Sequence, residues 1–198
     1  MFYPQNLKLS MPKKIVLIGA STGGPGQIEK IVLALDELHD VTMVIAQHMA
    51  IGFTPSFAKR LQDRSKNQVS VIQNNESLES GRVYLCCGRT SLYKNANALM
   101  FSQSESPRNS FNPDINVLFN SFVPFTNDFE ILSVILTGIG SDGVEACKSL
   151  SEKGASCLTE SEKSAIVDGM PSRARKEVKN VKVQEMNEIV LTIKEFCG

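Results

Sequence analysis

Apolar residues form continuous runs at three places in this chain instead of alternating with polar ones. The runs cover residues 14–19, 41–46 and 131–137. Strands that helices cover on both faces are apolar along their whole length. We therefore expect these three segments to be central strands of a parallel sheet.

Helix signals lie between these runs. In three segments a proline stands where the first turn of a helix would begin, and proline fits there because its missing N–H has no partner in that turn. The expected helices run from Pro25 to about Leu35, from Thr54 to about Arg64 and from Asn112 to about Phe122. Alternating strands and helices predict an α/β fold of three layers, with a doubly wound, mainly parallel sheet.

The middle of the chain departs from this alternation. Short apolar runs separated by turn residues lie between residues 69 and 101 and predict one or two antiparallel hairpins at the edge of the sheet. The polar segment 102–112 is expected to be an exposed loop that either borders the site or serves only as a linker, and the linker is favoured. The remaining elements are expected as a strand over 155–159, a helix over 171–178, a short strand near 181–184 and a closing helix near 186–196.

Length, charge and cysteine content narrow the function classes. We expect a short extension, residues 1–13, and then one domain, residues 14–198. Basic and acidic residues number 21 each, so no net field attracts the chain to nucleic acid or to an anionic membrane. No signal-peptide or membrane-spanning run is visible, and we expect a cytoplasmic monomer without membrane insertion. Five cysteines without a Cys-x-x-Cys spacing argue against a disulfide framework or a zinc site, and Cys86 and Cys87 have no histidine nearby in sequence that would activate a thiol.

The first apolar run ends in a serine flanked by glycines. The segment Gly19-Ala20-Ser21-Thr22-Gly23 matches Gly-x-Ser-x-Gly, in which the glycines allow a tight strand-to-helix turn that exposes the serine oxygen. A loop whose serine caps the next helix is the simpler alternative. The motif alone is too short to decide between the two.

Only two histidines are available as a general base for such a serine. His39 lies among charged residues at the end of an expected helix, so we expect it to be solvated. His48 directly follows the run 41–46, and the carboxyl end of a parallel sheet would place it beside Ser21. A histidine held only by backbone groups is the alternative.

A third motif follows the run 131–137. Gly138, Gly140 and Gly143 form Gly-x-Gly-x-x-Gly, and Glu160 closes the next strand, which is the spacing of a dinucleotide-binding turn. Asp142 argues against that function, because its carboxylate would repel a pyrophosphate at the helix N-terminus. As the third member of a catalytic triad, Asp142 would instead orient the histidine and stabilise its charged form.

Further segments carry a family resemblance that extends from about Lys14 to Arg175. They are Gly19-Ala20-Ser21-Thr22-Gly23-Gly24-Pro25, Gln47-His48-Met49, Gly52-Phe53-Thr54, Ser56-Phe57-Ala58, Arg60-Leu61, Leu136-Thr137-Gly138, Asp142-Gly143 and Gly169-Met170-Pro171. In this order they resemble the catalytic domain of the chemotaxis protein-glutamate methylesterases, the CheB family. The set is far more specific than any one of its motifs.

The resemblance implies Ser21 as nucleophile, His48 as base and Asp142 as orienting acid. It also implies hydrolysis of glutamyl methyl esters on chemoreceptor helices with release of methanol, deamidation of receptor glutamines, and no metal or organic cofactor. Thr22 and the backbone N–H of Ile139 match positions associated with oxyanion contacts. Gly138 and Gly140 are expected to line the site, and the candidates for substrate contact are Gln47, Met49, Phe53 and Met170.

This sequence departs from the family pattern in several loops. Ile139 replaces the usual methionine, Ala50-Ile51 replaces two prolines, Cys86-Cys87 replaces Ala-Pro, and Asn116 replaces an aspartate. These changes affect loop shape and substrate fit more than chemistry. The receiver domain common in the family has no counterpart before the first run, so either this sequence is a piece of a longer protein or the enzyme lacks that switch. The start Met1-Phe2-Tyr3-Pro4 favours the second explanation.

Two other functions remain open at this point. A dinucleotide-binding module built on residues 138–143 would fit the glycine spacing. A non-catalytic adaptor that keeps the fold and binds receptors would fit the resemblance. Retention of all three triad residues argues against the adaptor.

Overall fold

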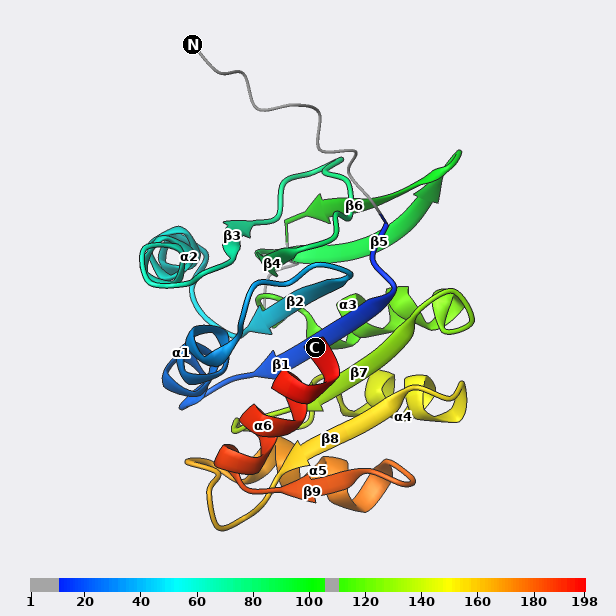
Figure 1. Ribbon diagram of the computed structural model, residues 1–198. Coiled ribbons are helices and arrows are strands. Elements are labelled where there is room, and N and C mark those ends of the chain that lie inside the picture. Colours follow the sequence, from blue (N-terminus) through cyan, green and yellow to red (C-terminus); the bar gives the residue numbers. More distant parts are fainter. Residues whose placement is uncertain (1–10, 106–110) are drawn as a thin grey trace.

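The computed structural model describes residues 11–105 and 111–198. Its centre is a seven-stranded sheet in the order β3-β4-β2-β1-β7-β8-β9, and every neighbouring pair is parallel (Figure 1). The strands are β1 (Lys14–Ala20), β2 (Val41–Gln47), β3 (Gln68–Val71), β4 (Arg82–Leu85), β7 (Glu130–Ile135), β8 (Ser156–Glu160) and β9 (Lys182–Gln184). The three continuous apolar runs form β1, β2 and β7 in the middle of this sheet, as expected.

Helices cover both faces of the sheet, so the fold has three layers (Figure 1). One face carries α1 (Gly24–Ala34), α2 (Thr54–Gln62) and α6 (Met186–Cys197), and the other carries α3 (Ile115–Phe122), α4 (Val144–Glu152) and α5 (Gly169–Glu177). Two short 3-10 helices, η1 (Ile51–Phe53) and η2 (Val123–Phe125), adjoin α2 and α3. Within residues 11–105 and 111–198, no helix combines the length and the apolar character that crossing a bilayer requires.

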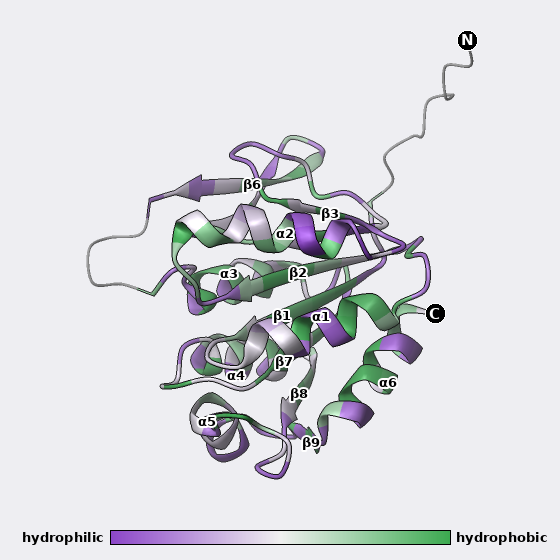
Figure 2. Ribbon diagram, turned by 90° about the vertical axis from the view of Figure 1, so that its left-hand side faces the viewer, coloured by the Kyte–Doolittle hydropathy of each residue, from purple (hydrophilic) through white to green (hydrophobic). Residues whose placement is uncertain are grey.

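Successive residues of the central strand enter different cores. Ile15 and Leu17 pack with α3 and α4, whereas Val16 and Ile18 pack with α1, α2 and α6. All four side chains are fully buried, which explains why the run is apolar throughout. In Figure 2, β1 and β2 are hydrophobic over most of their length, whereas α2 and α6 also carry hydrophilic stretches.

The segment expected to hold one or two hairpins contains one among the described residues. Strands β5 (Arg89–Asn95) and β6 (Ala98–Ser104) pair antiparallel and form a sheet of their own beside the main sheet. The expectation of a second hairpin is wrong, because β3 and β4 are parallel members of the main sheet. The connection 72–81 is long enough to return the chain to the same end of the sheet. The prediction failed here because short apolar runs indicate strands but not their direction.

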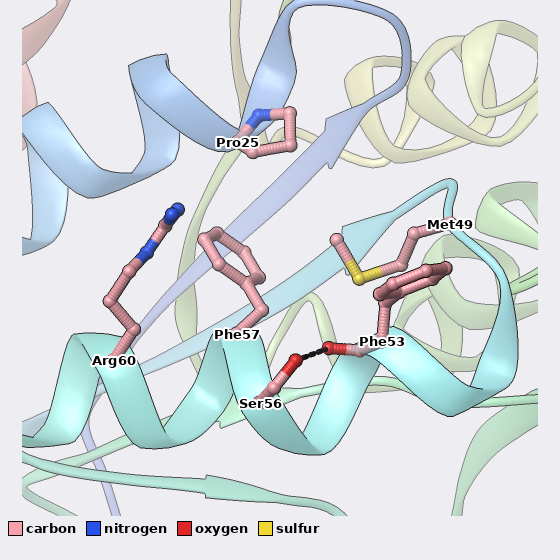
Figure 3. A pocket seen from close by; sticks show the side chains of 6 residues that line it. All are labelled: Pro25, Met49, Phe53, Ser56, Phe57 and Arg60. Carbon is pink, nitrogen blue, oxygen red and sulfur yellow. Dashed lines mark hydrogen bonds between the residues drawn. The ribbon is translucent and has the colours of Figure 1, made fainter.

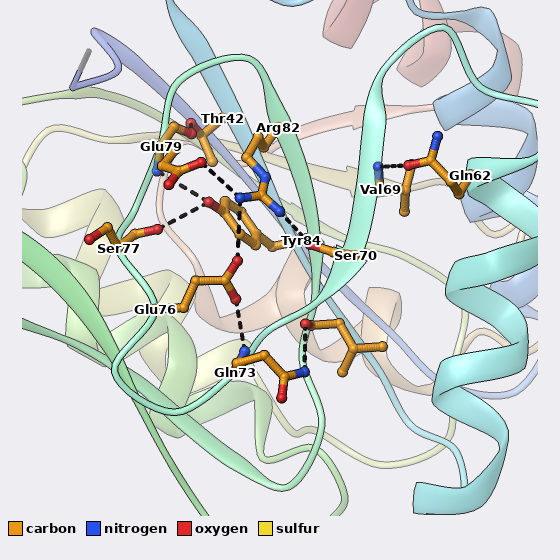
Figure 4. Close-up of polar contacts among 11 residues, drawn as sticks. Thr42, Gln62, Val69, Ser70, Gln73, Glu76, Ser77, Glu79, Arg82 and Tyr84 are labelled. Atoms are coloured by element: carbon orange, nitrogen blue, oxygen red, sulfur yellow. Dashed lines mark hydrogen bonds and ion pairs between the residues drawn. The ribbon is translucent and has the colours of Figure 1, made fainter. Parts of the chain in front are cut away.

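Arg82 holds this connection in place (Figure 4). Its guanidinium donates to the Ser70 hydroxyl at 3.0 Å and to the Glu79 carboxylate at 2.7 Å. The Tyr84 hydroxyl donates to the carbonyl of Ser77 at 3.1 Å. These bonds fasten the connection 72–81 to β3 and β4.

Two boundaries differ from expectation near the expected loop 102–112. Strand β6 continues to Ser104, so the loop begins later, and residues 106–110 lie outside the described part of the chain. Helix α3 begins at Ile115 because Asp114 caps it: the Asp114 carboxylate accepts the N–H of Val117 at 2.9 Å.

Candidate active site

The three residues expected to form a triad follow three neighbouring strands. Ser21 comes directly after β1, His48 directly after β2, and Asp142 lies in the loop after β7. These strands are adjacent in the order β2-β1-β7, and β1 and β2 end in register. The sheet therefore brings all three residues to its carboxyl edge, where α/β proteins place their sites.

A hydrogen bond joins His48 to Asp142. His48 Nε2 lies 2.8 Å from Asp142 Oδ2, and the carboxylate is almost fully buried. The same carboxylate accepts the backbone N–H groups of Ile115 at 2.9 Å and Asn116 at 3.0 Å. Because these N–H groups belong to the first turn of α3, they have no partner inside the helix and suit a negative charge. Sequence reasoning placed Asp142 at the site but missed the helix that holds it.

Phe111 fixes the plane of the imidazole. Its ring stacks on His48 with the ring centroids 4.9 Å apart and an angle of 2° between the planes. Since Asp142 engages Nε2, the nitrogen left to accept a proton from Ser21 is Nδ1. Sequence reasoning did not single out Phe111, which lies in the segment 102–112, where a linker was favoured over a loop that borders the site. His39, the other histidine, is exposed, as expected.

Ser21 occupies the strand-to-helix turn that its flanking glycines predicted. Its N–H donates to the carbonyl of Thr137 at 2.9 Å, and Gly23 has a φ of 88°, a conformation that favours glycine. The alternative that Ser21 caps α1 is wrong, because Gly23 is the N-cap residue and no side chain caps the helix. Among the described residues, the His48 side chain bonds to Asp142 and not to the Ser21 hydroxyl. In ligand-free enzymes such a bond often closes only when substrate binds.

Two backbone N–H groups beside Ser21 can stabilise an oxyanion. In a planar trans peptide, the C=O and the following N–H point in opposite directions. A hydrogen bond within the turn fixes the Ser21 carbonyl, and the Met170 N–H donates to the Gly138 carbonyl at 2.8 Å. The N–H groups of Thr22 and Ile139 belong to the same two peptides, so they point away from the groups that hold these carbonyls. Within the described part of the chain neither N–H donates a hydrogen bond, which leaves both available to a substrate oxygen.

The loop after β7 needs glycine at position 138, because Ser21 approaches its α-carbon. A Cβ on Gly138 would lie 2.6 Å from Ser21 Cβ and would overlap the Met170 sulfur. Met170 itself is fully buried beneath this loop, so it packs the site from below instead of facing a substrate. Gly140 has open space around its α-carbon and a φ of 87°.

We expect Gly138→Ala to lower kcat about 10- to 100-fold on a small activated ester. The added methyl group displaces Ser21, and a shift of about 1 Å at a reacting group costs on the order of 100-fold in rate. Steady-state hydrolysis of p-nitrophenyl acetate measures the loss. Gly26→Ala, at an open position in α1, is the matched control and should keep kcat. A Gly138→Ala enzyme as fast as this control would contradict the close approach.

The candidates for substrate contact lie at different depths. Met49 and Phe53 line an apolar pocket of about 420 Å³ between α1 and α2, together with Pro25, Ser56, Phe57 and Arg60 (Figure 3). Phe53 is 67% exposed, which suits contact with a partner. Gln47 is only 3% exposed, so its side chain lies inside the protein, not on the surface that a substrate meets.

Exposed apolar side chains surround the site. Ile51 and Phe53 follow His48 in the chain, Phe111 stacks on it, Ile139 follows Gly138, and Ile166 packs over Gly23. Ile51, Phe53, Phe111, Ile139 and Ile166 are five of the eight large apolar side chains that are exposed in the described part of the chain. Such clustering is typical of a surface that contacts another protein.

A buried carboxylate supports the loop after β7. Glu160 is fully buried and accepts hydrogen bonds from Gln27 Nε2 at 2.7 Å, the Thr137 N–H at 3.0 Å and the Ser164 hydroxyl at 3.0 Å. Thr137 in turn donates its hydroxyl to the Thr22 carbonyl at 2.9 Å, which links Glu160 to the serine turn. A dinucleotide would need this carboxylate at an open ribose site, so its burial argues against the nucleotide-binding alternative.

We expect Glu160→Gln to raise the thermal unfolding midpoint by a few degrees at pH 8. Burial raises the pKa of Glu160 above its value in the unfolded chain. The stability that protonated Glu160 contributes is therefore fully present below the pKa of the unfolded state and is lost as the pH rises through the pKa of the folded state. Glutamine carries no charge, and its amide can donate to Gln27 once the Gln27 amide turns over and brings Oε1, a buried oxygen without a partner among the described residues, toward position 160. Thermal melts from pH 4 to 8 measure the effect, which should vanish toward pH 4. A variant that is less stable at pH 8 would contradict it.

Cys86 is a poor competitor to Ser21 as a nucleophile. All five are free thiols, and Cys86, Cys147 and Cys157 are buried. Burial raises the pKa of Cys86 well above the ordinary thiol range, so its nucleophilic thiolate is disfavoured.

Comparisons with known proteins identify the family of this chain. A family model described as CheB methylesterase matches residues 16–193. A protein-glutamate methylesterase/protein-glutamine glutaminase of Carboxydothermus hydrogenoformans is 37% identical, covering 82% of this chain and 47% of the relative. One of Bacillus subtilis is 35% identical, covering 94% of this chain and 54% of the relative. The chain thus spans about half the length of the curated relatives it matches.

A solved structure has the same fold. The crystal structure of the Thermotoga maritima CheB methylesterase catalytic domain superposes with a TM-score of 0.84 and 27% sequence identity, covering 93% of this chain and 99% of that one. The expected fold class and family resemblance are both confirmed. By the match over residues 16–193, this chain belongs to the CheB methylesterase family.

Proposed function

We propose that this chain is a serine hydrolase that removes methyl esters from glutamate side chains on chemoreceptor helices and releases methanol. The same site would deamidate receptor glutamines, and residues 14–198 would form the catalytic domain. The observation that carries the proposal is the hydrogen bond from His48 to Asp142 beside Ser21, at the carboxyl edge of the sheet. Family membership and the names of the relatives support the choice of substrate.

The first half of the reaction transfers the substrate acyl group to Ser21. His48 Nδ1 takes the hydroxyl proton while Ser21 Oγ attacks the γ-carbonyl carbon of the glutamyl ester. The N–H groups of Thr22 and Ile139 stabilise the oxyanion, and Asp142 stabilises the imidazolium. The carbon–oxygen bond to the methoxy group then breaks, and the leaving group takes the proton from His48 and departs as methanol.

Water completes the reaction. His48 removes a proton from a water molecule, whose oxygen attacks the acyl carbon, and the bond to Ser21 breaks as the serine oxygen regains a proton. The products are a free glutamate side chain and the original enzyme. With a glutamine substrate the same steps release ammonia in place of methanol.

The exposed apolar residues around the site support a protein substrate. A small ester would not need Phe53, Ile139 and Ile166 on the surface, whereas a receptor helix would cover them. In this proposal the enzyme acts as a monomer in the cytoplasm on the receptors' signalling helices. Contact with nucleic acid and insertion into the membrane have no part in it.

Release of methanol from methylated receptors tests the proposal. Receptor-containing membranes carrying radioactive methyl esters are incubated with the enzyme, and volatile methanol is counted. We expect the wild type to release methanol and Ser21→Ala to release none. If the wild type hydrolyses p-nitrophenyl acetate but releases no methanol from receptors, the choice of substrate is wrong.

A further inference from the structure

The side chain of Gln47 connects the two loops that carry Ser21 and His48. Its Nε2 lies 2.7 Å from the carbonyl oxygen of Ser21 and 2.9 Å from that of His48. Gln47 is the last residue of β2 and is only 3% exposed, so water does not compete for these contacts. A single amide group thus connects Ser21 to His48 through their backbone carbonyls.

The two carbonyls determine which way this amide points. Each of the two N–H groups on Nε2 can donate to one carbonyl, whereas Oε1 in the same place would face two acceptors. Oε1 itself is buried and has no hydrogen-bond partner in the described part of the chain. The side chain of Gln47 is therefore held by the two hydrogen bonds that its Nε2 donates.

Gly24 provides the space for Gln47. A Cβ at position 24 would overlap Gln47 Oε1 and would lie 2.7 Å from the Cβ of Ala20. Gly24 does not have a positive φ, so the turn does not itself require glycine there. The Gln47 amide and the close approach of Ala20 together exclude a side chain.

The bond to Ser21 also acts on the peptide that follows it. The Ser21 carbonyl accepts from the Gly24 N–H inside the turn at 2.9 Å and from Gln47 across to β2. Because the Ser21 carbonyl and the Thr22 N–H belong to one planar peptide and point in opposite directions, fixing the carbonyl fixes the N–H. Gln47 therefore anchors a candidate oxyanion donor as well as the nucleophile.

We propose that Gln47 is a positioning residue for the hydrolysis. Its two donor contacts set the separation of Ser21 and His48 and orient the Thr22 N–H. This assignment replaces the expectation that Gln47 contacts substrate, and it rests on the proposed hydrolase function. It does not depend on which ester is the natural substrate.

The test uses Gln47→Met, which keeps the length of the side chain and removes the donor. We expect kcat for p-nitrophenyl acetate to fall about 10- to 100-fold with KM changed less than about threefold, because the transition state loses alignment while the surface that binds the ester is unchanged. Labelling of Ser21 by a fluorophosphonate should slow by a similar factor.

A second variant, Gln47→Glu, guards against poor folding of the first. Its carboxylate cannot donate to the two carbonyls, whereas the protonated acid can donate to one. The ratio of its kcat to that of the wild type should therefore be higher at pH 6 than at pH 8.5. A ratio that does not change with pH would count against the proposal.

Asn67→Leu is the matched control. Asn67 is another buried amide: its Nδ2 donates to the Asp36 carbonyl at 3.0 Å and its Oδ1 accepts the Leu38 N–H at 2.8 Å, away from the site. It should lose stability but keep kcat within about twofold. If Asn67→Leu and Gln47→Met lost kcat equally, or if Gln47→Met kept the wild-type kcat, the positioning role of Gln47 would be overturned. The hydrolase function would not be affected by either result. A wild type that neither hydrolyses esters nor labels at Ser21 would overturn the hydrolase function, and the positioning role with it.

Discussion

Replacing Ser21 with alanine will abolish ester hydrolysis and leave the fold intact. Loss of the nucleophile in a triad enzyme costs about 10⁴-fold or more in kcat, and the residual rate comes from binding and oxyanion contacts. The contacts that hold the turn belong to the backbone of Ser21, and alanine keeps them. Unfolding free energy should therefore change by less than about 0.5 kcal/mol.

Two measurements check the Ser21 prediction. Hydrolysis of p-nitrophenyl acetate gives kcat, and thermal denaturation followed by circular dichroism gives stability. A Ser21→Ala enzyme that is folded and retains a tenth or more of wild-type activity would show that another group attacks the ester. In that case the site at the sheet edge would not be the site of chemistry.

Asp142→Ala will reduce both activity and stability. The substitution removes the bond that orients His48, and activity should fall on the order of 10⁴-fold. It also leaves the N–H groups of Ile115 and Asn116 without their acceptor at the start of α3. Two lost hydrogen bonds at a buried helix end should cost about 2 kcal/mol of unfolding free energy.

Asp114→Ala separates the two effects. Asp114 caps the same helix through the Val117 N–H and does not touch His48. This variant should lose about 1 kcal/mol of stability and keep kcat near the wild-type value. Kinetics and urea denaturation of both variants measure the difference. If Asp114→Ala lost as much activity as Asp142→Ala, the role of Asp142 would be structural.

The central fold could be predicted because burial on both faces leaves a clear trace in sequence. Strands β1, β2 and β7 are apolar at successive positions since neighbouring residues enter opposite cores. The short strands β3 and β4 carry the same local pattern as a hairpin, and their parallel pairing depends on a connection that Arg82 fastens. Contacts of this kind join residues far apart in sequence, so local patterns do not contain them.

The arrangement of Ser21, His48 and Asp142 at one edge of the sheet could also be predicted, because the ends of adjacent parallel strands must meet there. The residues that hold it could not. Phe111 lies in a polar segment with no periodicity, and the first turn of α3 reaches Asp142 only through the tertiary fold. The sequence motif Gln47-His48-Met49 suggested a substrate contact for Gln47, and only the direction of its side chain shows the link between the two loops.

Mapping of a fluorophosphonate adduct by mass spectrometry tests the central claim most directly. The probe reacts with a serine only if a base and oxyanion donors activate it, and it requires no knowledge of the natural substrate. We predict one adduct per chain, at Ser21, that is lost in His48→Ala. A folded enzyme whose Ser21 stays unmodified, or whose labelling does not depend on His48, would contradict the proposal that Ser21, His48 and Asp142 act as one catalytic unit.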